Sequence, residues 1–133
     1  MPMFDPTTRI LVVDDSASMR SSLIAQLTEL GFKDFIEAGN GFLGWEALEK
    51  ASPPVGMILS DQNMPECTGF ELLKRVRAEA KYNSVPFIMV STEGEKQMIM
   101  DAIKIGASNY ITKPVELEAL KTKLEKTAER FLK

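Results

Sequence analysis

Short apolar runs alternate with amphipathic segments along the whole chain. Five of the runs are rich in β-branched and aliphatic residues and predict strands, at residues 9–13, 35–38, 57–59, 86–90 and 109–112. After each run, apolar side chains recur every three or four residues, a spacing typical of helices, around residues 19–30, 45–48, 70–76, 96–105 and 115–132. Strands and helices that alternate five times predict a doubly wound α/β fold, in which five helices cover both faces of a five-stranded parallel sheet.

Glycines and apolar spacing refine two of these helices. Gly31 and Gly106 follow helical segments at positions where a helix commonly ends. In the helix at residues 96–105, the spacing predicts that Met100 and Ile103, together with Ile99, face the core.

The length and the N-terminal residues limit the organisation of the chain. Its 133 residues suit one domain with one core. We therefore expect residues 1–133 to form a single domain with residues 1–8 as an N-terminal tail, since no repeat or linker interrupts the pattern. Residues 1–8 lack the apolar stretch of a signal peptide, and no apolar run is long enough to cross a bilayer. These features predict a cytoplasmic protein without membrane insertion.

Composition excludes several classes of function. The net charge of −3 does not suggest a nucleic-acid surface. Histidine is absent, so neither a Ser-His triad nor a His-ligated zinc site can be built from this chain. Cys67 is the single cysteine, which excludes an internal disulfide.

Polar residues stand directly after several predicted strands. They are two adjacent carboxylates, a third carboxylate, a hydroxyl and an ammonium group: Asp14, Asp15, Asp61, Ser91 and Lys113. Each one alone has an ordinary explanation, as a helix cap, a turn former or a solvated strand end. Because parallel strands end at the same edge of a sheet, where ligands bind in open α/β folds, we expect the five groups to converge.

The charges on this edge suggest a cation and a phosphoryl group. Carboxylates ~5 Å apart repel by about 3 kcal/mol per pair at an effective dielectric constant of ~20. A hard divalent cation with oxygen ligands, most plausibly Mg²⁺, would relieve that repulsion. With the cation in place, Lys113 and Ser91 could bind phosphoryl oxygens, and Asp61 could act as a covalent nucleophile.

Five motifs resemble those of a known family. They read VVDDS at residues 12–16, SDQNMP at 60–65, STE at 91–93, GASNY at 106–110 and KP at 113–114. In combination, over about residues 8–131, they resemble the response-regulator receiver domain of the single-domain CheY-like type. The resemblance implies a flavodoxin-like sheet with the strand order 2-1-3-4-5.

The resemblance also implies roles for the acidic residues. Asp61 would accept a phosphoryl group from a phosphohistidine of a histidine kinase and become a 4-aspartylphosphate. Asp15 would bind Mg²⁺ directly, Asp14 mainly through metal-bound water, and Asn63 through its backbone carbonyl. The protein would then assist its own phosphorylation and dephosphorylation without being a turnover enzyme.

Further residues would pass on the phosphorylation signal. Ser91 resembles the switch hydroxyl, Lys113 the phosphate-binding ammonium, and Tyr110 the aromatic switch; the simpler alternative for Tyr110 is a half-buried strand residue. The Lys113–Pro114 bond resembles the family's cis peptide. A partner would read the face made by the fourth helix, the fifth strand and the fifth helix, so that the output is a population shift. Glu93 is expected to tune the lifetime of the phosphoryl group.

Met19–Arg20 and the GASNY run resemble chemotaxis receivers, which implies a monomer acting on a target such as a flagellar motor switch protein. The absence of an output domain fits a phosphorelay intermediate equally well.

Residues 39–48 are about three residues longer than usual, so we expect an irregular start to the second helix. There Phe42 or Trp45 would contact a partner or, as the simpler alternative, pack in the core.

Two other readings of the acidic edge are open. A haloacid-dehalogenase-type phosphatase also has an Asp nucleophile, but it resembles this chain less, because Asn63 stands where a second Asp acts as general acid. A binding module without phosphorylation would have no need to keep a repulsive cluster of acids.

Overall fold

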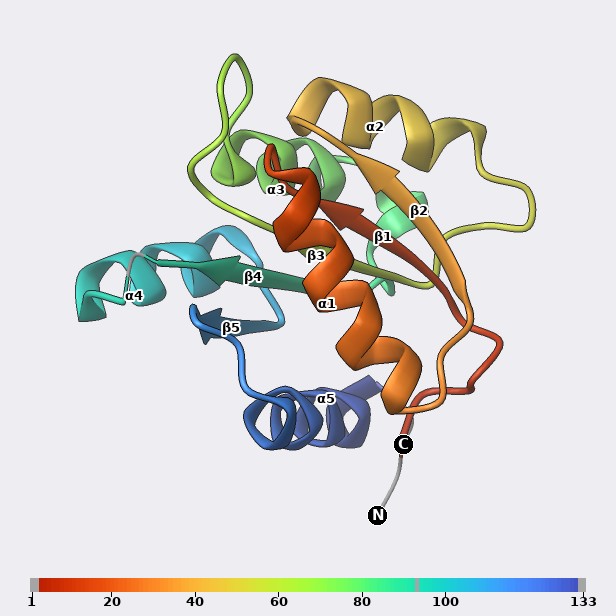
Figure 1. Cartoon of the computed structure of the whole chain (residues 1–133). Coiled ribbons are helices and arrows are strands. Elements are labelled where there is room, and N and C mark those ends of the chain that lie inside the picture. Colours follow the sequence, from red (N-terminus) through yellow and green to blue (C-terminus); the bar gives the residue numbers. More distant parts are fainter. Residues whose placement is uncertain (1–2, 93, 132–133) are drawn as a thin grey trace.

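Five parallel strands form one sheet in the order β2-β1-β3-β4-β5. The structure is a computed structural model that describes residues 3–92 and 94–131. Its strands are β1 (Arg9–Val13), β2 (Asp34–Ala38), β3 (Met57–Ser60), β4 (Phe87–Ser91) and β5 (Asn109–Thr112). Figure 1 shows them side by side across the middle of the molecule. The predicted fold and the strand order implied by the resemblance are therefore confirmed.

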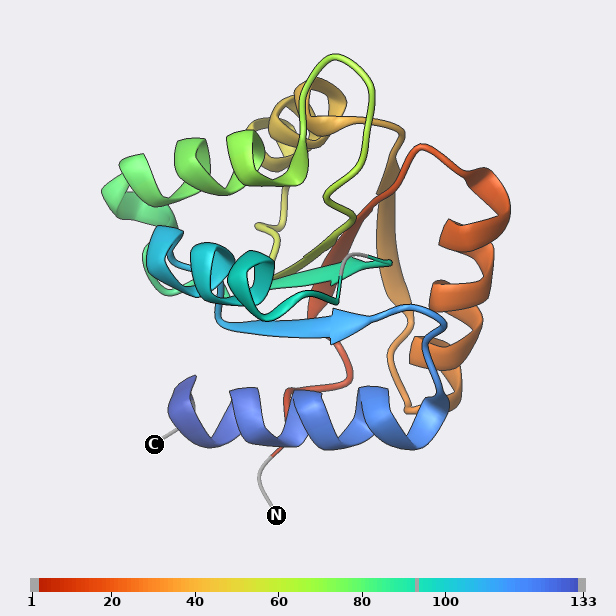
Figure 2. The same cartoon turned by 90° about the vertical axis from the view of Figure 1, so that its left-hand side faces the viewer.

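Helices cover both faces of this sheet (Figure 2). They are α1 (Ala17–Glu29), α2 (Gly41–Lys50), α3 (Gly69–Ala78), α4 (Lys96–Ile105) and α5 (Leu117–Phe131), with a short 3-10 turn, η1 (Ala80–Tyr82), after α3. α1 and α5 pack on one face, and α2, α3 and α4 pack on the other. The expected end of α5 at residue 132 lies outside the described residues.

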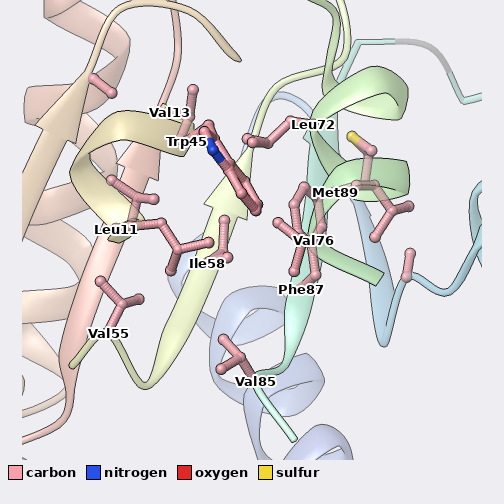
Figure 3. Packing of buried hydrophobic residues seen from close by; sticks show 14 of the residues in the cluster. Leu11, Val13, Trp45, Val55, Ile58, Leu72, Val76, Val85, Phe87 and Met89 are labelled. Carbon is pink, nitrogen blue, oxygen red and sulfur yellow. The ribbon is translucent and has the colours of Figure 1, made fainter. Parts of the chain in front are cut away.

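The strands build two separate cores because neighbouring side chains point to opposite faces. In β1, Leu11 and Val13 belong to the core under α2, α3 and α4, whereas Ile10 and Val12 belong to the core under α1 and α5. Figure 3 shows the first of these cores, with Trp45 of α2 in it. Burial on both faces explains why the strands read as continuous apolar runs and not as alternating ones.

The orientation of α4 differs from the prediction. Met100 and Ile103 were expected to face the core, but their side chains are 43% and 47% exposed. Ala102 is the buried residue of the helix, and Ile99 and Ile105 pack against the core beside it. Since α4 carries apolar residues around most of its circumference, their spacing alone could not identify the buried face. The expectation for Ile99 is confirmed.

The start of α2 also differs from the prediction. Its first turn is regular, because the Asn40 side chain accepts a hydrogen bond from the Leu43 amide at 2.9 Å and caps the helix. Gly41 is the first helical residue and lies directly against Cys67. Trp45 is buried, which confirms core packing for this ring, whereas Phe42 is 53% exposed.

Gly41 is close enough to Cys67 for a test by substitution. A Cβ atom at position 41 would lie 2.3 Å from Cys67 Sγ and 2.9 Å from its carbonyl oxygen. We expect Gly41→Ala to lower the free energy of unfolding by about 1–3 kcal/mol, the usual cost of overpacking, despite the better helix propensity of alanine. Urea denaturation followed by far-UV circular dichroism measures the change.

Gly39→Ala is the matched control. A Cβ atom there would have only the Arg20 guanidinium as a neighbour, at an ordinary 3.9 Å. Its effect should stay below about 1 kcal/mol in either direction. Equal destabilisation by both substitutions would contradict the contact with Cys67.

Candidate functional site

Three carboxylates meet at the carboxyl edge of the sheet. Asp14 and Asp15 follow β1 and Asp61 follows β3, and one oxygen of each lies within 4.8 Å of the others. The parallel register brings them together, because Val13 pairs with Ser60 and the Asp61 amide donates to the Val13 carbonyl at 2.9 Å. The predicted convergence of these three groups is therefore present.

Lys113 reaches the same cluster from the end of β5. Its Nζ lies 2.7 Å from Asp14 Oδ2 and 3.5 Å from Asp61 Oδ2, and only 10% of its side chain is exposed. The backbone amide of Lys113 donates to the Ser91 carbonyl at 2.8 Å, which joins the ends of β4 and β5. The Lys113–Pro114 peptide is cis, as the resemblance implied, and so is Ser52–Pro53.

Asp14 and Asp15 differ in exposure. Asp14 is buried: its amide donates to the Ala38 carbonyl at 3.0 Å, and its Oδ1 accepts from the Ser16 amide at 2.9 Å. Asp15 is exposed. Since both oxygens of Asp14 already accept protein hydrogen bonds, the exposed Asp15 has more freedom than Asp14 to bind an ion directly.

Burial raises the pKa of Asp61. The loss of hydration is the largest cause, and the negative charge of Asp14 raises the pKa further. Lys113 and the backbone amides of Gln62 and Asn63 lower it in part, and the Gln62 amide bond measures 2.8 Å. Ionised Asp61 is therefore held at a cost, and a cation beside it would be stabilised.

The loop after Asp61 is packed tightly against it, which the sequence did not indicate. A Cβ atom at Gly69 would lie 2.3 Å from the Asp61 carbonyl oxygen, so only glycine fits at the start of α3. Gln62 Oε1 accepts from the Phe70 amide at 2.7 Å and fixes the same turn. The sequence feature from which this close packing could have been predicted is the glycine in the first turn of the helix after the acidic loop.

The expected switch residues lie in β4 and β5. Ser91 ends β4 and is fully buried, and Tyr110 is 4% exposed within the core under α2, α3 and α4. Tyr110 pairs with Met89 in the sheet, two residues before Ser91. Asn63 is exposed in the loop after Asp61, and Glu93 lies outside the described residues.

The acidic cluster is able to hold a metal ion. Its three carboxylates are hard oxygen ligands, which suit Mg²⁺ or Ca²⁺ better than a soft metal. The Cys67 thiol is buried in the same loop, and burial raises its pKa, so it stays protonated and does not compete as a ligand.

A family model described as the response regulator receiver domain matches residues 10–125. The chain belongs to this family. It is 48% identical over 117 residues to a chemotaxis protein CheY homolog of Campylobacter jejuni, which covers 88% of this chain and 89% of that protein. Chemotaxis protein CheY1 of Helicobacter pylori is 42% identical over 117 residues, with 88% and 94% of the two chains covered.

A solved structure agrees with these relatives. The chemotaxis response regulator CheY4 of Vibrio cholerae superimposes with a TM-score of 0.81 at 31% identity and covers 91% of this chain and 98% of that one. The protein is thus a CheY-like receiver of two-component signalling, a class of signalling proteins and not of classical turnover enzymes. Within the described ranges, no helix is long and apolar enough to span a bilayer.

The raised pKa of Asp61 predicts that this acid destabilises the metal-free receiver. Its folded pKa lies above its ordinary value of 3.8, so ionised Asp61 costs stability at pH 7. Asp61→Asn should raise the free energy of unfolding in EDTA by about 1 kcal/mol. The gain should shrink as the pH falls through the folded pKa and vanish below 3.8, where both states are protonated. Urea denaturation across this pH range measures it.

Asp5 provides a control of opposite sign. Hydrogen bonds from Thr7 lower the pKa of Asp5, so Asp5→Asn should not stabilise the protein at pH 7. Added Mg²⁺ should stabilise the wild type more than Asp61→Asn, because an ion that binds only the folded state raises its stability. A lower stability of Asp61→Asn in EDTA at pH 7 would contradict the assignment of Asp61 as the strained acid.

Proposed function

We propose that Asp61 accepts a phosphoryl group from a phosphohistidine of a histidine kinase in a Mg²⁺-dependent reaction. The observation that carries this proposal is a buried carboxylate of raised pKa that lies within 4.8 Å of two further carboxylates and 3.5 Å from the ammonium of Lys113. An acid of this kind is a competent nucleophile once its surroundings are neutralised.

In the transfer, an Asp61 oxygen forms a bond to phosphorus while the bond from phosphorus to the donor imidazole nitrogen breaks. The electron pair of the broken bond stays on the imidazole, which takes up a proton as it leaves. Lys113, whose Nζ already lies between Asp14 and Asp61, is placed to stabilise the phosphoryl oxygens. Bound Mg²⁺, held by Asp14, Asp15, Asp61 and the Asn63 carbonyl, would supply charge neutralisation.

Phosphorylation then acts as a switch. It replaces the single negative charge of the Asp61 carboxylate with the about −1.5 to −2 charge of a phosphoryl group, at a site with a single ammonium group among its described residues. We propose that the Ser91 hydroxyl and Lys113 bind the phosphoryl group and that Tyr110 couples this change to the outer face of β5. The burial of Ser91 and Tyr110 in adjacent strands, with Tyr110 paired to Met89 two residues before Ser91, supports this route. The lifetime-tuning role of Glu93 remains a prediction.

The output face would be formed by α4, β5 and α5. Met100 and Ile103 supply exposed apolar surface on α4, which suits partner binding. Because the relatives at 48% and 42% identity are chemotaxis proteins, we propose a chemotaxis target such as a flagellar motor switch protein. We also propose that residues 1–133 form one monomeric domain in the cytoplasm.

The alternatives are less well supported. A phosphorelay intermediate would use the same acid, but the Campylobacter jejuni and Helicobacter pylori relatives described above are named for chemotaxis. A haloacid-dehalogenase-type phosphatase needs a second acid where this chain has Asn63.

The nucleophile is tested by labelling. Asp61→Asn should abolish incorporation of phosphate from acetyl phosphate or a phosphorylated histidine kinase in Mg²⁺, because an amide cannot form the acyl phosphate. Intact-protein mass spectrometry measures the modification, with Asp5→Asn as the control that should label normally. Undiminished labelling of Asp61→Asn would overturn the assignment.

The output face is tested separately. Ile103→Lys should weaken phosphorylation-dependent binding to a flagellar switch protein and leave labelling of Asp61 unchanged, because the side chain is 47% exposed and α4 keeps its fold. Leu43→Lys changes an apolar side chain of similar exposure, 50%, on α2 and is the control. A pull-down with phosphorylated protein distinguishes the two; equal loss for both would argue against the α4 face.

A further inference from the structure

Arg20 links three parts of the acidic edge. It lies in the first turns of α1, and its guanidinium reaches back to the end of β1 and across to β2. Nη1 donates to the backbone carbonyl of Asp14, and Nε donates to Glu37 Oε1 at 2.9 Å. Only 18% of the Arg20 side chain is exposed, which is little for a charged group at the rim of a sheet.

The contact with Asp14 completes a set of four that holds this residue. The other three are the hydrogen bond from the Asp14 amide to Ala38, the bond from the Ser16 amide to Oδ1, and the Lys113 ammonium on Oδ2. If Lys113 turns toward a phosphoryl group, it leaves Asp14. Two of the four contacts are made by side chains, those of Lys113 and Arg20. Once Lys113 has turned away, the Arg20 side chain alone of these two still joins Asp14 to other elements.

The loop that carries Asp14 and Asp15 is subject to electrostatic repulsion. Asp14 and Asp15 are repelled by Asp61, because one oxygen of each lies within 4.8 Å of the others. That force pushes the loop away from the sheet edge. The guanidinium opposes it through a charge-assisted bond to a backbone atom, and Glu37 on β2 fixes the direction of the guanidinium.

We propose that Arg20 is a positioning residue for the acidic cluster: by holding the Asp14 carbonyl against β2 and Glu37, it sets the Mg²⁺ affinity of the site. This inference rests on the proposed function, because it assumes that the cluster binds Mg²⁺. Arg20 touches neither the ion nor the phosphoryl group. It acts through Asp14 and Asp15, as the outer partners of metal ligands do.

The substitution Arg20→Lys tests the role of the forked group. Lysine keeps the charge but cannot bind Glu37 and the Asp14 carbonyl with two nitrogens in a fixed plane. We expect the Mg²⁺ affinity, measured by isothermal titration calorimetry with MgCl₂, to fall about tenfold. The rate of phosphorylation by acetyl phosphate should fall at limiting Mg²⁺ and recover at saturating Mg²⁺. Glu37→Gln keeps an acceptor for Nε and should cost less affinity than Arg20→Lys.

Arg9 offers a control of the same design on the same two strands. At the opposite end of β1, Arg9 Nε pairs with Asp34 of β2 at 3.0 Å, Nη1 donates to the Pro53 carbonyl at 3.1 Å, and 20% of the side chain is exposed. Arg9→Lys should lower the thermal midpoint about as much as Arg20→Lys and leave the Mg²⁺ affinity unchanged.

The outcomes separate the inference from the proposed function. Wild-type affinity in Arg20→Lys, or an equal loss in Arg9→Lys, would overturn the positioning role and leave the phosphoacceptor intact. A rate that stays low at saturating Mg²⁺ would also overturn it. Should Arg20→Lys fail to fold, Glu37→Ala tests the same arrangement, because it removes the acceptor that Arg20 Nε binds; wild-type Mg²⁺ affinity in Glu37→Ala would contradict the positioning role. Absence of Mg²⁺ binding in the wild type would overturn both proposals.

Discussion

Repulsion among carboxylates that the parallel sheet brings to one edge is the constraint on which the site depends. The register of β1 and β3 brings one carboxylate oxygen each of Asp14, Asp15 and Asp61 within 4.8 Å of the others. Lys113 neutralises part of this charge but bonds more closely to Asp14 than to Asp61. The protein therefore folds around an unfavourable cluster of charge, which a cation at this edge would relieve.

The rest of the fold supplies the rigidity that this arrangement needs. Each central strand is buried on both faces, so the sheet edge is fixed by two cores and not by one. Two glycines add to this rigidity, because their lack of a side chain allows close packing. Gly69 lies against the Asp61 carbonyl, and Gly41 lies against Cys67. Because the loop after Asp61 is packed this closely, it cannot move away from the neighbouring carboxylates, and the repulsion among them persists.

The sequence predicted the parts of the structure that depend on local pattern. Strand ends, the alternation of elements and the convergence of Asp61 with Asp14 and Asp15 follow from apolar runs and from parallel topology. The direction of α4 did not follow, because apolar residues on several sides of that helix leave its buried face to be chosen by Ala102 and its neighbours. Likewise the contact of Gly41 with Cys67 joins segments far apart in sequence, and no spacing rule reports it.

The outward orientation of Met100 and Ile103 also connects the acidic edge with the surface of the molecule. Because Met100 and Ile103 face outward, α4 can bind a partner without exposing the residues that it packs into the core. Tyr110 lies under this helix in the core, paired with Met89 of the strand that ends at Ser91. A charge added at Asp61 must be met by groups at the ends of β4 and β5. β5 also packs against α4, so the groups that meet this charge and the proposed binding surface share a strand.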